Sequence, residues 1–172
     1  MAQISREAAI DRLIAKDAIT TVLSKYAQAI DRCDIEQLKT VYWPEATDDH
    51  GTFSGNAMEF AEHIMPLLST MTHTMHHITT IDVTLIEANR AQCQSYFMAW
   101  HEVDDSEVIV GGRYLDNFEC RDGEWRIRDR VVVMDWNQTR PNTAKWGAGE
   151  MFSTLKFGGR APGDISYGWR RK

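Results

Sequence analysis

Two adjacent histidines, His76 and His77, open an apolar, β-branched run that continues from residue 78 to residue 83. Such a run is typical of a β-strand. An imidazole works as a general base near neutral pH when a second group fixes which ring nitrogen carries the proton. Asp31, forty-five positions upstream at the end of a long helical pattern, is the candidate for that group. We therefore hypothesise an Asp31–His76 dyad; the alternative is one histidine packed in a strand and one in solvent.

Helices are expected before this strand. Apolar residues recur at three- and four-residue steps from residue 5 to residue 30, which predicts one amphipathic helix, broken once at most. Asp34, with Gln37 three residues later, has the pattern of an N-cap for a short second helix that ends before Trp43-Pro44. The polar segment 45–55 is interpreted as a loop with a short edge strand at Phe53. Asn56 should cap a third helix, which Pro66 should kink or end early.

Strands are expected after the histidines. Four runs, at about 76–87, 91–103, 107–120 and 125–136, are separated by short turns, so neighbouring strands should be antiparallel. Helices followed by a strand meander predict an α+β fold, with a curved, mostly antiparallel sheet packed on the N-terminal helices. We expect residues 1–140 to form one domain. Residues 141–172 should be a tail that covers the cavity or a neighbouring subunit, because they contain several large apolar side chains: Trp146, Met151, Phe152, Phe157 and Trp169.

Composition restricts the function classes. The chain has 172 residues, of which 43% are hydrophobic and 26% charged, and a formal net charge of −6, which gives nucleic-acid binding no electrostatic support. Its three cysteines are widely spaced, which argues against a disulfide framework and against a CxxC metal site. The first residues lack the pattern of a signal peptide and no apolar run has membrane-spanning length, so a cytoplasmic protein is expected.

Metal and cofactor motifs are not evident in the sequence. His63, His73, His76 and His77 lie close together but lack the HExxH spacing. No GxGxxG follows a strand, and no GxSxG elbow is present. We therefore expect chemistry that needs neither a metal ion nor an organic cofactor.

Four local strings are informative together: residues 26–31 (YAQAID), 75–80 (MHHITT), 112–114 (GRY) with Phe118, and 122–127 (DGEWRI). They resemble the SnoaL-like branch of the nuclear transport factor 2-like superfamily, the branch of scytalone dehydratase, bile-acid 7α-dehydratase and hexachlorocyclohexane dehydrochlorinase. The resemblance covers roughly residues 5–140 and implies a cone-shaped α+β barrel. Many proteins with this fold are not enzymes, so the fold alone does not give the activity.

The resemblance also implies roles for individual residues. Asp31 and His76 match the catalytic dyad of the dehydratases and the dehydrochlorinase, Tyr26 matches a tyrosine five residues before the aspartate, and Arg130 matches an arginine late in the last strand. His101 is an approximate match to a second histidine of scytalone dehydratase. Tyr26 is equally explained as a helix residue whose hydroxyl reaches the surface, and Arg130 as one of alternating arginines on an open sheet face.

These observations favour a cofactor-independent lyase, dehydratase-like, that acts on a small or medium aromatic or alicyclic compound. Related chemistry, such as loss of halide or formaldehyde or a ketosteroid-isomerase-like isomerisation, stays open. The alternative from another class is a non-catalytic small-molecule-binding or assembly module. The resemblance implies a homotrimer. Large apolar or aromatic side chains that would line the substrate cavity, or simply belong to the core, are Trp43, Phe53, Met65, Met98, Trp100 and Met134, together with His101.

Overall fold

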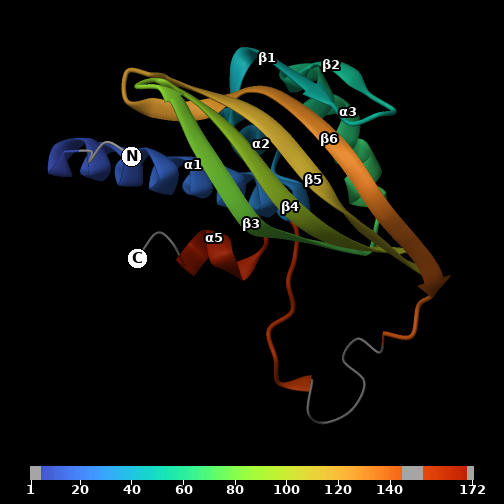
Figure 1. The fold of residues 1–172 in the computed structure, drawn as a ribbon. Coiled ribbons are helices and arrows are strands. Elements are labelled where there is room, and N and C mark those ends of the chain that lie inside the picture. The colour runs from blue at the N-terminus through green and yellow to red at the C-terminus, as the bar shows by residue number, and fades with distance from the viewer. Residues whose placement is uncertain (1–4, 145–152, 170–172) are drawn as a thin grey trace.

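A computed structural model describes residues 5–144 and 153–169 (Figure 1). The helices are α1 (Arg6–Arg32), α2 (Ile35–Thr40), α3 (Ala57–Thr70) and α5 (Ile165–Trp169). The strands are β1 (Tyr42–Asp49), β2 (Ser54–Asn56), β3 (His73–Glu87), β4 (Arg90–Val103), β5 (Ser106–Arg121) and β6 (Glu124–Pro141). No described helix is long and apolar enough to cross a membrane.

The six strands form one curved sheet in the order β2-β1-β6-β5-β4-β3. All neighbours are antiparallel except β1 and β6, which are parallel. The edge strands β2 and β3 do not pair with each other, so the sheet curves without closing. Figure 1 shows α1 running along the inner side of this curve, with α3 beside β1 and β2. The predicted α+β plan, with a curved and mostly antiparallel sheet on N-terminal helices, is therefore confirmed.

The helix starts follow the local signals. The Asp34 carboxylate accepts a hydrogen bond from the Gln37 amide, and Asn56 accepts one from the Met58 amide, as expected of N-caps. Helix α1 is continuous. Pro66 was expected to kink or end α3, which instead continues to Thr70. Pro66 and the residue four positions earlier both face solvent, where water can satisfy the backbone carbonyl that the proline leaves unbonded.

The prediction of a loop over residues 45–55 is wrong for its first half. Residues 42–49 form β1, which pairs with β6 through contacts distant in sequence. Phe53 lies just before β2 rather than within it. The polar side chains that made this stretch look like a loop have partners inside the fold, since the Tyr42 hydroxyl donates to the buried Asp48 carboxylate at 2.6 Å.

Along the sheet, side chains alternate between an inner face toward α1 and an outer face. Ala99, Phe97 and Tyr114 belong to the inner face and are buried. The outer face carries several large apolar side chains that stay exposed in the single chain: Met75, Tyr96, Met98, Leu115, Val131 and Trp136.

The last described segment returns to the C-terminal end of α1 (Figure 1). The Tyr167 hydroxyl donates to Asp34 at 2.6 Å, and Arg32 pairs with Asp164 at 3.2 Å. Of the apolar tail residues expected to be covered, Phe157 and Trp169 are exposed in the single chain, Trp169 to 73%. Trp146, Met151 and Phe152 lie outside the described residues.

Candidate active site

Asp31 and His76 are in direct contact. Asp31 lies in the last turn of α1 and His76 near the start of β3. One carboxylate oxygen accepts the His76 backbone N–H at 2.8 Å, and the other is 2.7 Å from the His76 Nδ1. The Asp31 and His76 side chains are only 11% and 9% exposed. A carboxylate can only accept, so Nδ1 carries the ring proton and the Nε2 lone pair is left available to take another.

The neighbouring histidines occupy different environments. His77 pairs across the sheet with Met98 and is exposed, so it faces away from the dyad. His101, on the inner face, meets the His76 ring edge-on, with 5.3 Å between ring centroids. Burial, and the proximity of His76, lower the pKa of His101 to about 4. His101 is therefore a neutral imidazole at physiological pH, able to donate or accept but carrying no charge.

Tyr26 is in the core rather than at the surface. It is 1% exposed, and its hydroxyl lies 3.4 Å from the His50 Nε2. The His50 Nδ1 contacts the Asp48 carboxylate, which makes a second imidazole–carboxylate pair on β1 and its following turn. Burial raises the pKa of Tyr26 above its usual value. His50 was not among the predicted site residues, although the alternation of Asp48 and His50 in a strand would have placed both side chains on one face.

Arg130 does not lie on an open sheet face. Its guanidinium has no exposed surface and makes two hydrogen bonds to Asp116, at 2.7 and 2.8 Å. It also lies 4.1 Å from the ring centroids of both Tyr26 and Tyr114. Although burial alone would lower it, the Asp116 carboxylate raises the pKa of Arg130 well above its ordinary value. Arg130 Nη1 has no hydrogen-bond partner among the described residues.

The residues expected to line the cavity do not all lie on the same face of the sheet. Met134 pairs with Gly112 on the inner face and is 60% exposed, and Phe53 packs near Phe60 with 5.7 Å between ring centroids. Met65 on α3 belongs to the closed core. These three remain on the dyad's side of the sheet.

Three of the expected lining residues lie elsewhere. Met98 and Trp100 project from the outer face of β4, because they alternate with the inward Ala99. Trp43 is held at the far end of the sheet, where its ring lies under the guanidinium groups of Arg121 and Arg126, at 4.5 and 4.8 Å. Their assignment to the substrate cavity is therefore corrected.

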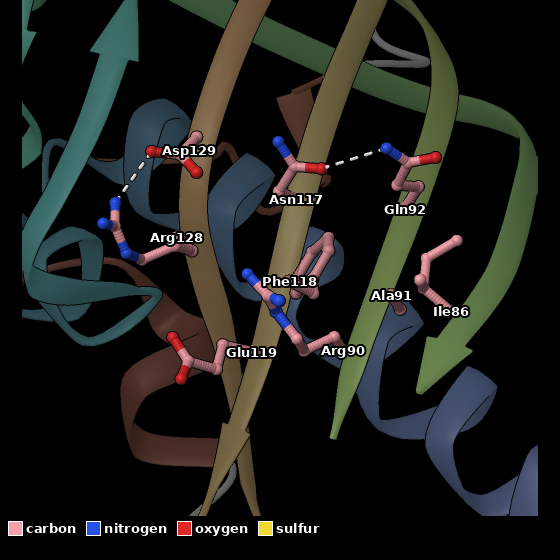
Figure 2. Close-up of a pocket in the computed structure, with 9 residues that line it drawn as sticks. All are labelled: Ile86, Arg90, Ala91, Gln92, Asn117, Phe118, Glu119, Arg128 and Asp129. Carbon is pink, nitrogen blue, oxygen red and sulfur yellow. Dashed lines mark hydrogen bonds and ion pairs between the residues drawn. The ribbon is translucent and has the colours of Figure 1, made fainter. Parts of the chain in front are cut away.

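A groove of about 290 Å³ opens far from the dyad, near the turn between β3 and β4 (Figure 2). Polar side chains from β4, β5 and β6 line it, among them Gln92, Asn117 and Asp129. It contains none of the predicted catalytic residues. Within residues 5–144 and 153–169, no group of three or more His, Cys, Asp or Glu side chains is arranged to hold a metal ion.

Comparison with known proteins shows a consistent set of relatives. A family model described as the SnoaL-like domain matches residues 11–131. The γ-hexachlorocyclohexane dehydrochlorinase of Sphingobium indicum is 21% identical over 135 residues, which cover 74% of this chain and 85% of that protein. A solved type 2 hexachlorocyclohexane dehydrochlorinase has a TM-score of 0.71 at 19% identity, covering 77% of this chain and 93% of its own. A scytalone dehydratase-like protein from Novosphingobium aromaticivorans has a TM-score of 0.69 at 18% identity, covering 80% and 93%. These structures share the cone-shaped α+β fold.

Proposed function

Because the chain belongs to the SnoaL-like family, we propose that it is a cofactor-independent enzyme of the elimination or isomerisation type, and specifically a dehydratase-like lyase. The single observation that supports this most is the Asp31–His76 contact. Both carboxylate oxygens are committed to His76, one to its backbone and one to its ring. That arrangement fixes the tautomer and the ring orientation, which a general base requires.

In the proposed reaction, His76 Nε2 takes a proton from a substrate carbon next to an activating group. The C–H electron pair becomes the new C=C bond, and the bond from the neighbouring carbon to the leaving group breaks. Asp31 stabilises the imidazolium through Nδ1–H. If the leaving group is a hydroxyl, the imidazolium can donate the proton to its oxygen, so that it departs as water. A halide departs as the anion and needs no proton.

The remaining side chains would bind the substrate or support the site. His101 would hydrogen-bond the substrate as a neutral donor or acceptor, while Met134 and Phe53 would supply apolar contact for an aromatic or alicyclic ring. Tyr26 and Arg130 are buried and committed to His50 and Asp116. We propose that they stabilise the core next to the site and do not contact the substrate.

The test is a screen of eliminable aromatic and alicyclic alcohols and halides, run without added cofactor. His76→Ala should abolish turnover of any substrate found, and His77→Ala is the matched control, since it removes the adjacent imidazole from the outer face. Equal activity in the two variants would refute the role of His76. Tight binding of ring compounds without turnover by the wild type would instead favour a binding module.

We also propose that the chain forms a homotrimer through the outer sheet face. The resemblance to trimeric dehydratases motivates this number of subunits. The exposed side chains of Met98, Leu115 and Trp136 motivate the choice of surface, because contiguous apolar area on a sheet face is typical of a contact between subunits.

A further inference from the structure

One guanidinium from the C-terminal segment reaches the place where α1, α3 and β3 meet. Arg160 Nη1 donates to the Asp31 backbone carbonyl at 2.5 Å and to the Thr74 hydroxyl at 2.9 Å. Arg160 Nη2 donates to the carbonyls of Leu68 and Met71, at 3.2 and 3.0 Å. Four acceptors, on α1, α3, β3 and the connection between α3 and β3, thus share one side chain, which comes from outside the stretch that matches the family model.

Two of these acceptors, the carbonyls of Asp31 and Leu68, belong to the last turns of α1 and α3, and that of Leu68 also accepts the Met71 N–H. The last carbonyls of an α-helix have no intrahelical donor. In α1, the backbone N–H of Asp34 donates to the Ala29 carbonyl, and that of Cys33 donates to the Ile30 carbonyl. The carbonyls of the final two residues of the helix therefore need donors from elsewhere. Arg160 donates to the Asp31 carbonyl, and the Ala161 backbone N–H donates to the Arg32 carbonyl at 2.6 Å. A cation is also favoured at a helix C-terminus, and Arg160 lies at the ends of both α1 and α3.

The same contacts hold both partners of the dyad. Asp31 is bonded at its own backbone, and Thr74 stands two residues before His76 on the same face of β3. The segment that carries Arg160 is fixed in turn: Arg32 donates to the Gly159 carbonyl at 2.8 Å and pairs with Asp164, whose carboxylate also accepts the Gly159 amide. The distance between Asp31 and His76 is therefore set by two links, the direct contact and the bridge through Arg160.

We infer that Arg160 is a positioning residue for the Asp31–His76 dyad, and that the C-terminal segment is part of the active-site framework. This role rests on the proposed function. A planar guanidinium is needed because its two terminal nitrogens point to different elements, whereas a lysine ammonium is a single point. Small displacements of a catalytic group reduce rates strongly, so removal of the bridge should lower turnover more than substrate binding.

The first experiment measures the dyad without any substrate. In nitrogen-15 NMR of the full chain, Arg160→Ala should lower the exchange protection of the His76 amide and let the ring populate both neutral tautomers. Arg140→Ala is the control, because it removes an arginine that pairs with Glu107 at 2.7 Å on the sheet. A His76 amide and ring unchanged in Arg160→Ala would overturn the inference, whether or not the elimination chemistry is correct.

The second experiment uses turnover once a substrate is known. Arg160→Ala should lose kcat by roughly one to two orders of magnitude, with KM changed by less than about threefold. Millimolar ethylguanidinium should restore part of the loss, and Arg160→Lys should resemble Arg160→Ala more than the wild type. Full activity in Arg160→Lys would show that charge alone suffices and would overturn the bridging geometry. A thermal unfolding scan confirms that each variant is folded when measured.

Discussion

Replacing Asp31 by asparagine keeps the size of the side chain but removes one acceptor. The structure requires two, for the His76 backbone N–H and for Nδ1–H. If the amide oxygen faces the backbone N–H, the amide nitrogen faces Nδ1, which must then accept. The ring proton moves to Nε2, and the nitrogen that should take the substrate proton is lost.

The opposite orientation of the asparagine is also costly. The amide NH₂ would face the His76 backbone N–H, leaving a buried donor unsatisfied at about 1–3 kcal/mol. The imidazolium would also lose a charge-assisted hydrogen bond worth about 1.5–3 kcal/mol. The unsatisfied N–H is present in the ground state and the transition state alike, so it disfavours this orientation without slowing the chemical step, whereas loss of the charge-assisted bond slows that step by about ten- to 150-fold. Because the first orientation lacks the base altogether, Asp31→Asn should lower kcat by roughly two or more orders of magnitude.

The assay combines kcat with nitrogen-15 NMR of the His76 ring in the resting protein. Asp129→Asn serves as the control, because that aspartate pairs with Arg128 on β6 and is partly exposed. The double variant Asp31→Asn/His76→Ala should be scarcely slower than His76→Ala, since the two residues act as one unit. Additive losses, or an asparagine variant with wild-type kcat and the proton still on Nδ1, would refute the reasoning.

Three further outcomes are expected. Turnover should survive exhaustive chelation; a loss that one divalent ion restores would redirect attention to His63, His73 and His77. Met98→Glu should convert the assembly to monomers in light scattering, whereas a wild type that is already monomeric at micromolar concentration would reject the trimer. Because the pKa of His101 is lowered to about 4, its contribution to stability is present above pH 6.5 and is lost as pH falls toward 4. Urea titrations should show up to about 2 kcal/mol of this loss, allowing for partial exposure, and His101→Gln should remove it; an unchanged pH slope in that variant would contradict the shift.

The sequence predicts those parts of the molecule whose signals are local. The caps at Asp34 and Asn56, the long strands and the meander order follow from side-chain periodicity and turn chemistry, and they are observed. The contact between Asp31 and His76 was predicted because a helix end and a strand start were both visible. Its catalytic role stays a prediction.

The parts that could not be predicted depend on contacts distant in sequence. Strand β1 forms because β6 pairs with it and because Tyr42 and His50 satisfy Asp48, none of which its polar composition shows. Arg130 belongs to a buried ion pair only because the register of β5 and β6 brings Asp116 opposite it. Arg160 reaches the dyad through the fold of the tail, for which the sequence offers no periodic signal.

The order of side chains along the inner face bears on the stereochemistry of the proposed reaction. His76 pairs with Ala99, and the next inward layer of the sheet is apolar, with Phe97 and Met134 flanking Gly112. A Cβ at Gly112 would lie 2.2 Å from the Val133 carbonyl oxygen and 2.9 Å from the Phe97 ring, so only glycine fits here while Phe97 stacks on the buried Tyr114, with 4.4 Å between centroids.

The polar cluster of Arg130 and Asp116 lies two inward layers further along the strands, beyond this apolar layer. Beside the dyad on this face lie His101, which is uncharged at physiological pH, and Thr74, whose hydroxyl accepts a hydrogen bond from Arg160. In the proposed reaction, the proton donor for a departing hydroxyl group is the His76 imidazolium that has just received the substrate proton. Because one ring must reach both the proton and the leaving group, both must lie on the same side of the substrate. If His76 serves in both steps as proposed, we predict that a dehydration proceeds by syn elimination.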